Sequence, residues 1–249
     1  MYYNIYFSPT GGTKKVADIL ISHLSKEYQT IDLCRENEVI SLSSDDVCLI
    51  SVPSYGGRIP TTAAERLQKI CANGARAILV CVYGNRAYEE TLSELQYVLL
   101  SRGFSCSAAV AAIAEHSIIR EFAAGRPDES DHTELIGFAE KIRDRLENPR
   151  KTTLIVPGGH GIYKPYKNTP FLPIETDACT NCGIFGQSCP TNAIGNTPYD
   201  IDTERCIKCM RCASVCPNGA RNLDEEIFRA LRERLAAVCS TRKANEVFL

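Results

Sequence analysis

Residues 206–217 read CIKCMRCASVCP, and residues 179–190 read CTNCGIFGQSCP. With an offset of 27 residues, the two stretches align at three cysteines and at the proline that follows the last of them. They differ at one sulfur position, because Phe185 stands where the later stretch has Cys212. The chain therefore contains one ligand pattern twice, with a single donor missing from the first copy.

Cysteines at this spacing are typical ligands of iron–sulfur clusters. In the run C-x2-C-x2-C-x3-C-P, the first three thiolates bind one cluster and the fourth binds the other. Applied to both copies, the pattern predicts one complete [4Fe-4S] site, made by Cys189, Cys206, Cys209 and Cys212. A second site is left with three thiolates, because phenylalanine has no donor atom. Its expected ligands are Cys179, Cys182 and Cys216.

The site with three thiolates has three interpretations. Three thiolates match the three irons of a [3Fe-4S] cluster. Alternatively, a [4Fe-4S] cluster binds there and its fourth iron takes water or an external thiolate. In the third interpretation the site is empty and Phe185 packs as core, which forgoes the folding energy that a cluster supplies.

A structural zinc site is the competing interpretation, since C-x2-C pairs commonly bind zinc. One tetrahedral ion would use Cys179, Cys182, Cys206 and Cys209. Three cysteines and both Cys-Pro steps would then have no role. We therefore favour iron–sulfur clusters.

Composition argues against several other classes of protein. The formal net charge is −2 over 249 residues, so we expect no general attraction to nucleic acid or membranes. Apolar runs such as residues 77–82 and 108–114 are too short to cross a bilayer. The N-terminus MYYNIYFSPTGG has no basic segment followed by an apolar one, so we expect no signal peptide and a cytoplasmic location. Thirteen cysteines in such a chain do not indicate a disulfide framework.

Residues 1–148 alternate strand-like apolar runs with segments whose apolar residues recur at helical spacing. This alternation is typical of a parallel sheet covered by helices on both faces, and it predicts a doubly wound, five-stranded α/β domain. A last helix is expected at residues 132–147, with Asp131 and Glu134 as a capping box. The expected strands are residues 2–7, 29–34, 47–52, 77–82 and 105–114.

Three further segments are expected after this domain. Residues 149–176 are rich in proline and glycine and indicate a linker or strap, in which His160 is interpreted as a loop residue. Residues 177–222 contain the cysteine repeat. Residues 223–249 are predicted to form a C-terminal helix, at about 224–240, and a tail.

A polar loop, SPTGGT at residues 8–13, follows the first expected strand. Glycines allow a ligand to approach the backbone, and the N–H groups at the start of the next helix attract an anion. Neutral hydroxyl and backbone donors suit a phosphate monoester. The candidate phosphate ligands are Ser8, Thr10, Gly11, Gly12 and Thr13.

Two later loops follow the third and fourth expected strands, PSYGGRIP at 53–60 and VYGNRAYEE at 82–90. In such sheets the ligand lies beyond the carboxyl ends of the strands at the switch point, where loops after strands one, three and four can meet. An aromatic ring there can stack on a flavin. Arg58 or Arg86, if close to that ring, would favour an anionic reduced form. The candidate ring contacts are Tyr55, Gly56, Gly57, Gly84, Asn85, Arg86 and Tyr88.

These features together resemble a flavodoxin–ferredoxin fusion, with a flavodoxin-like domain before a small α+β ferredoxin-like domain. The loop [ST]-x-T-G-x-T resembles the FMN phosphate loop of flavodoxins, and the cysteine run is similar to that of bacterial two-cluster ferredoxins. The resemblance implies bound FMN and one-electron exchange between clusters and flavin. Phe185 departs from the family pattern and leaves the composition of its cluster open.

Electron transfer is the expected function, because clusters change by one electron and flavins by one or two. We expect a redox partner protein or a small-molecule electron donor or acceptor. Two alternatives stay open. One is an FMN-dependent reductase of a small molecule that uses NAD(P)H or ferredoxin-type electrons, although no nicotinamide-binding motif is evident. The other is a redox or iron-sensing interaction module.

Overall fold

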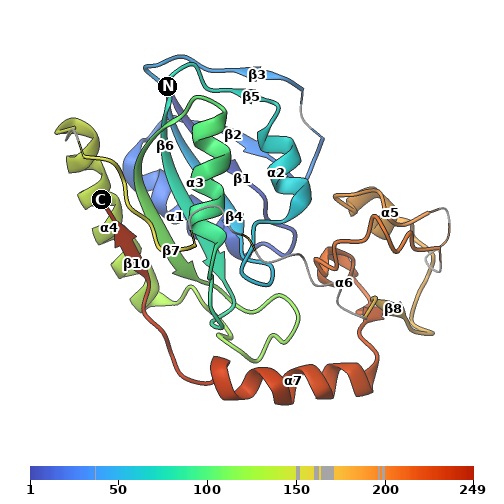
Figure 1. Cartoon of the computed structure of the whole chain (residues 1–249). Coiled ribbons are helices and arrows are strands. Elements are labelled where there is room, and N and C mark those ends of the chain that lie inside the picture. The colour runs from blue at the N-terminus through green and yellow to red at the C-terminus, as the bar shows by residue number, and fades with distance from the viewer. Residues whose placement is uncertain (37, 150–151, 160–162, 164–170, 196, 198–199) are drawn as a thin grey trace.

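The computed structural model describes residues 1–36, 38–149, 152–159, 163, 171–195, 197 and 200–249. His160 and parts of the predicted strap lie outside these ranges. Figure 1 shows a large α/β part built from the first two thirds of the chain, a smaller part that contains the cysteine repeat, and a long helix that runs back between them.

A six-stranded sheet forms the centre of the large part (Figure 1). Its order is β10-β7-β6-β4-β1-β2, and every neighbouring pair is parallel except β10 and β7. The five parallel strands confirm the predicted doubly wound sheet, and their arrangement is the 2-1-3-4-5 order of flavodoxin-like folds. The strands are β1 (Tyr2–Tyr6), β2 (Gln29–Asp32), β4 (Val47–Pro53), β6 (Arg76–Tyr83), β7 (Ser105–Ile113) and β10 (Glu246–Phe248).

Helices cover both faces of this sheet. On one face, α1 (Gly12–Leu24) and α4 (Glu129–Glu147) pack their apolar stripes on the strands. On the other face, α2 (Thr61–Leu67) and α3 (Thr91–Ser101) do the same. A two-stranded parallel sheet, β3 (Ile40–Ser41) and β5 (Ile70–Cys71), lies outside the main sheet. Among the helices that the structure describes, none has both the length and the apolar character needed to cross a bilayer.

Helix α4 begins three residues earlier than predicted, and its predicted capping box was wrong. The box is formed by Asp128, whose side chain accepts from the Asp131 N–H at 3.1 Å, and Asp131, which accepts from the Asp128 N–H at 3.0 Å. Asp131 also accepts from the buried Arg126 guanidinium at 2.8 Å. The Asp131 carboxylate is thus occupied by Arg126 and by the Asp128 N–H, and Asp128, not Asp131, is the N-cap of α4.

The smaller part is an α+β unit with internal symmetry. Helices α5 (Ile184–Ser188) and α6 (Arg211–Val215) occupy equivalent places in the two copies of the cysteine pattern. A two-stranded antiparallel sheet, β8 (Ile174–Glu175) with β9 (Arg221–Asn222), joins its ends. This is the small ferredoxin-like unit that the sequence predicts.

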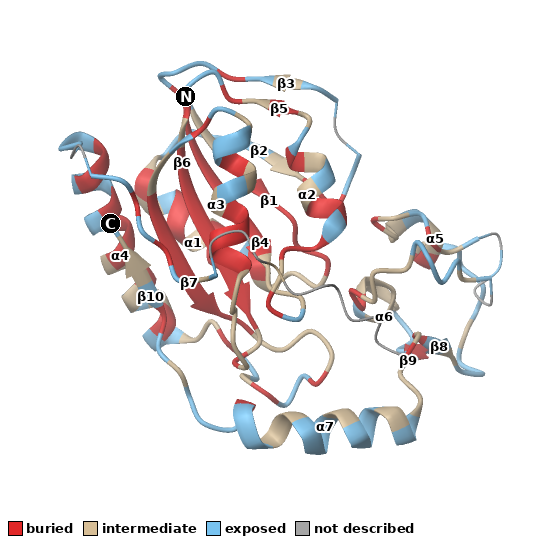
Figure 2. Cartoon of the chain, viewed as in Figure 1, coloured by how far each residue is buried: buried red, intermediate tan, exposed pale blue. Residues whose placement is uncertain are grey.

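Helix α7 (Glu225–Cys239) leads the chain back to the large part and confirms the predicted C-terminal helix. Most of its residues are exposed or half-buried, as Figure 2 shows. The tail then forms β10, and Asn245 accepts from the Ile113 N–H at 2.9 Å. The smaller part is thus connected to the sheet through both ends of its sequence.

Candidate functional site

The phosphate loop lies between β1 and α1, and its geometry fits an anion. Gly11 has φ 92°, a left-handed conformation that side chains rarely adopt, and no side chain caps the helix there. A Cβ on Gly12 would lie 3.0 Å from the Cβ of Ala114. The Ser8 hydroxyl accepts from the Lys14 N–H at 2.9 Å, which fixes the loop against the first helical turn. The first turn of α1 has no acidic residue that would repel a phosphate.

A tight turn after β4 carries Tyr55. Tyr55 and Arg58 exchange two backbone hydrogen bonds, at 2.8 and 3.2 Å, across Gly56 (φ 61°) and Gly57 (φ 86°). Gly57 also has no room for a side chain, because its Cβ would lie 2.4 Å from a carboxylate oxygen of Glu89. The turn therefore requires glycine at residue 57, and its two hydrogen bonds fix the backbone of Tyr55.

The surroundings of the Tyr55 phenol disfavour its ionised form. Burial raises the pKa of Tyr55 well above its ordinary value, and the Cys209 and Cys34 thiols raise it further. A neutral aromatic ring at this turn can stack on a flavin.

The loop after β6 uses its side chains differently from the prediction. Asn85 is buried, and its amide donates to the carbonyl oxygens of Cys239 at 2.6 Å and Thr241 at 2.9 Å. The Tyr88 hydroxyl donates to Glu246 at 2.7 Å. Both side chains therefore hold the C-terminal segment, and a flavin contact from this loop would come from its backbone.

The remaining residues of these loops are also engaged. The ring of His116 packs on Gly84, whose Cβ would lie 2.5 Å from the imidazole Cδ2. Arg86 pairs with Glu89 at 2.7 Å. The Arg58 guanidinium forms a two-point ion pair with Glu94, at 2.7 and 2.5 Å. Each arginine is thus paired with a carboxylate, which reduces the effect of the arginine charge on a nearby flavin.

The structure brings together the four cysteines predicted to form the complete site. Cys189, Cys206, Cys209 and Cys212 line one cavity. Apolar walls surround it, among them Pro190, Ile194 and Ile207. Burial raises the pKa of the Cys206, Cys209 and Cys212 thiols. Bare thiolates would be costly there, whereas iron ions would supply the positive charge that thiolates need, so this cavity fits a cluster.

The backbone around the cysteines repeats with the sequence. Left-handed residues occur at Asn181 and Gly183 in the first copy, and at Lys208 and Met210 in the second. The Ala193 N–H donates to the Cys189 sulfur at 3.3 Å, and the Ala220 N–H donates to the Cys216 sulfur at 3.2 Å. Such N–H donors stabilise negative charge on sulfur and tune cluster potentials. The two copies thus present their cysteines in the same way.

The copies differ around Phe185. Its ring is buried, at 5% exposure, and the Arg221 guanidinium carbon lies 5.1 Å from the ring centre. Cys182 of the same copy is exposed, and Cys179 and Cys216 are half-buried. In the site with three thiolates, the position of the missing fourth ligand is therefore buried in protein, whereas the side that carries Cys182 faces solvent. Among the described residues, no three His, Cys, Asp or Glu side chains group around a position for a single metal ion.

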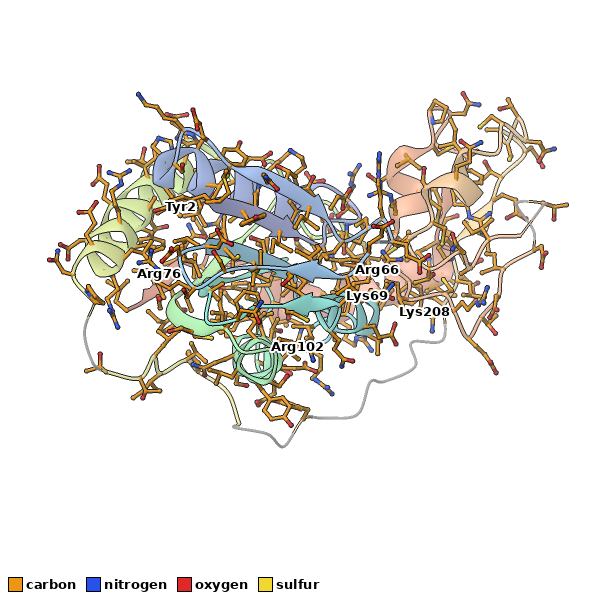
Figure 3. All side chains as sticks on the ribbon, turned by 90° about the horizontal axis from the view of Figure 1, so that it is seen from above. Tyr2, Arg66, Lys69, Arg76, Arg102 and Lys208 are labelled. Atoms are coloured by element: carbon orange, nitrogen blue, oxygen red, sulfur yellow. The ribbon has the colours of Figure 1, made fainter. Side chains whose placement is uncertain are left out.

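The complete cysteine set is the one that faces the phosphate loop. Arg211, which precedes Cys212, donates to the carbonyl oxygen of Pro9 at 3.2 Å. Arg66 of α2 donates to the carbonyl oxygen of Pro190, which follows Cys189, at 2.5 Å. Figure 1 shows α6 on the side of the smaller part nearest the sheet, and Figure 3 shows Arg66 at the end of the large part that faces it. Neither arginine was predicted as a site residue, although Arg211 lies inside the cysteine run.

Parts of the chain are similar to known proteins. The family described as 4Fe-4S binding domain matches residues 199–222. A ferredoxin of Chlorobaculum thiosulfatiphilum is 44% identical over 50 residues, which cover 17% of this chain and 82% of the ferredoxin. An uncharacterized protein of Methanothermobacter thermautotrophicus is 34% identical over 65 residues, which cover 25% of this chain and 14% of that protein. A solved flavodoxin of Streptococcus pneumonia TIGR4 aligns with 57% of this chain and 96% of its own, with a TM-score of 0.42 and 21% identity.

Proposed function

Because the chain belongs to the ferredoxin family through its C-terminal part, we propose that it transfers electrons between a [4Fe-4S] cluster and a bound FMN. The cluster supplies one-electron chemistry, and the flavin couples one-electron to two-electron partners. The cluster ligands are Cys189, Cys206, Cys209 and Cys212.

One observation carries this proposal. The cavity lined by four cysteines is also lined by Arg211, which donates to the carbonyl oxygen of Pro9 in the phosphate loop at 3.2 Å. The complete cysteine set therefore lies in the part of the small unit that contacts the candidate flavin site. Short separation favours electron exchange within one chain, because the two centres have a high effective concentration.

The FMN phosphate is held at the start of α1. Gly11 and Gly12 allow close approach, and the helix N-terminus supplies backbone donors and a positive dipole end. Thr10 and Thr13 add hydroxyl donors, while Ser8 braces the loop through Lys14. Tyr55 stacks on the ring. The Gly84–Tyr88 loop contributes backbone contacts only, because Asn85 and Tyr88 bind the C-terminal segment.

The site of Cys179, Cys182 and Cys216 holds a three-iron cluster. Buried Phe185, with the Arg221 guanidinium against its ring, closes the corner where a fourth iron would need an outside ligand. Water or an external thiolate would have to displace both side chains. A [3Fe-4S] cluster lacks that corner and needs no ligand there. This cluster is the outer one, since its exposed Cys182 faces solvent.

Iron, acid-labile sulfide, zinc and flavin per chain, measured on anaerobically purified protein, test the proposal. About seven irons with one FMN are expected for a four-iron and a three-iron cluster. About eight irons would overturn the three-iron assignment, and about four would mean an empty outer site. Zinc without sulfide or flavin would contradict electron transfer altogether.

A further inference from the structure

A buried arginine lies beside the four-cysteine cavity. Arg221, in β9, is 1% exposed and lines the same cavity as Cys206 and Cys212. Its Nη1 lies 3.0 Å from a carboxylate oxygen of Glu175, the residue opposite it in β8. Its other face is covered by the Phe185 ring. The guanidinium is therefore held on two sides within reach of the cluster ligands.

The repeat indicates that this charge is not required by the fold. The residue 27 positions before Arg221 is Ile194, which lines the same cavity and pairs with Ile201. The first copy of the repeat therefore has an apolar side chain at the position equivalent to Arg221. The desolvation cost of burying a charged pair is roughly what its attraction returns, so apolar replacements often match it in stability. A role other than stability explains the charge better.

Arg221 lines the cavity together with Cys206 and Cys212, so its guanidinium lies on the same cavity wall as two ligands of the complete set. Positive charge at this place stabilises negative charge on the sulfur atoms.

We propose that Arg221 raises the reduction potential of the cluster held by Cys189, Cys206, Cys209 and Cys212, and that Glu175 limits the rise. This inference rests on the proposed function. Reduction adds one electron from a low-potential one-electron donor, and the cluster becomes more negative by one charge. No bond to the protein forms or breaks, and the arginine keeps its proton in both states. The guanidinium therefore stabilises the reduced state more than the oxidised state, and the carboxylate does the reverse.

Phe185 has a part in this arrangement. A cysteine at residue 185 would bind the outer cluster, whereas the phenyl ring provides a flat surface for the guanidinium. Phenylalanine at residue 185 therefore has two effects. It leaves the outer site with one ligand fewer, and it holds the Arg221 guanidinium beside the four-cysteine cavity.

Anaerobic redox titration of the intact protein, with the reduced cluster followed by electron paramagnetic resonance, tests the inference. Arg221→Met is expected to shift the potential of the four-iron cluster to a more negative value. Glu175→Gln is expected to shift it to a more positive value, and Arg221→Lys to leave it near that of the unchanged protein. The matched control is Arg205→Met. Arg205 precedes Cys206 in the sequence, but its side chain is 64% exposed, so water screens its charge.

Opposite shifts for Arg221→Met and Glu175→Gln support the inference. Equal potentials for all variants with intact clusters would overturn it, as would shifts in the same direction. If Arg221→Met fails to assemble a cluster, Glu175→Gln still decides the sign, because only a more positive potential in that variant agrees with the inference. No four-iron signal in the unchanged protein would instead contradict the proposed function, so the two failures are distinguishable.

Discussion

Arg66 donates from its Nη2 to the carbonyl oxygen of Pro190 at 2.5 Å. The contact joins helix α2 of the sheet to the proline that follows Cys189, a ligand of the complete cysteine set. The two residues are 124 positions apart in the sequence, and their contact fixes which face of the small unit meets the sheet. The orientation of the cluster toward the candidate flavin loops depends on contacts of this kind.

Arg66→Met tests that orientation. A hydrogen bond from a charged group contributes about 1.5–3 kcal/mol, so its loss should lower the ratio of docked to undocked molecules by about ten- to a hundredfold. We expect unchanged iron and flavin content and slower electron exchange between cluster and flavin, measured by rapid photoreduction. Lys69→Met is the control, because Lys69 lies three residues away and its side chain forms a surface ion pair with Glu36 at 3.4 Å. Equal rates for both variants would contradict the docking role of Arg66.

Gly11→Val tests the phosphate loop. At φ 92° a β-branched side chain is strained, and it would also narrow the approach to the helix start. We expect loss of FMN from the purified protein, measured by flavin release on denaturation, with iron and sulfide unchanged. Gly137→Ala in the middle of α4, where no atom lies within 4 Å of the new Cβ, should keep FMN. Full flavin content in Gly11→Val would refute the loop assignment.

Phe185→Cys tests the outer site. A thiolate at this position supplies the fourth ligand and lies beside Arg221, whose charge stabilises it. The expected result is a gain of about one iron per chain and replacement of the three-iron signal by a four-iron one in electron paramagnetic resonance. Phe185→Leu keeps an apolar side chain and should change neither. An unchanged spectrum in Phe185→Cys would contradict the alignment of the two copies that places residue 185 at a ligand position.

Asn85→Ala separates two roles for the loop after β6. The amide bonds to Cys239 and Thr241 indicate an anchor for the C-terminal segment. Losing two such buried bonds should lower the free energy of unfolding by about 2–3 kcal/mol, measured in urea. Amide exchange in β10 should become faster, and FMN content should stay the same. Loss of FMN without loss of stability would instead make Asn85 a flavin ligand.

Sequence patterns predicted the elements that rest on local or periodic signals. The buried strands and the cysteine run carry such signals, so the parallel sheet and the seven candidate ligands could be read from residue order. Strand β10 was missed because Glu246–Phe248 is too short to show alternation, and its pairing depends on β7 and on Asn245.

Contacts that no local sequence pattern shows account for the other differences between the predictions and the structure. The side chains of Asn85 and Tyr88 turn toward a segment more than 150 positions later, which no local pattern indicates. The α4 cap is Asp128, and the Asp131 carboxylate, which the sequence suggested as the cap, accepts from Arg126 and from the Asp128 N–H. In the sequence Arg221 is one of many charged residues, and only the structure shows that it is buried, packs on Phe185 and shares a cavity with Cys212.

Electron exchange between the inner cluster and the flavin is the central claim, and one kinetic measurement tests it most directly. The anaerobic protein is photoreduced with a low-potential one-electron donor, and the absorbance of flavin and cluster is followed in the unchanged protein and in Cys209→Ser. We predict that the flavin is reduced in a phase matching the reoxidation of the cluster, at a rate independent of protein concentration, and that Cys209→Ser loses this phase. A flavin reduced at the same rate in both proteins would contradict the claim.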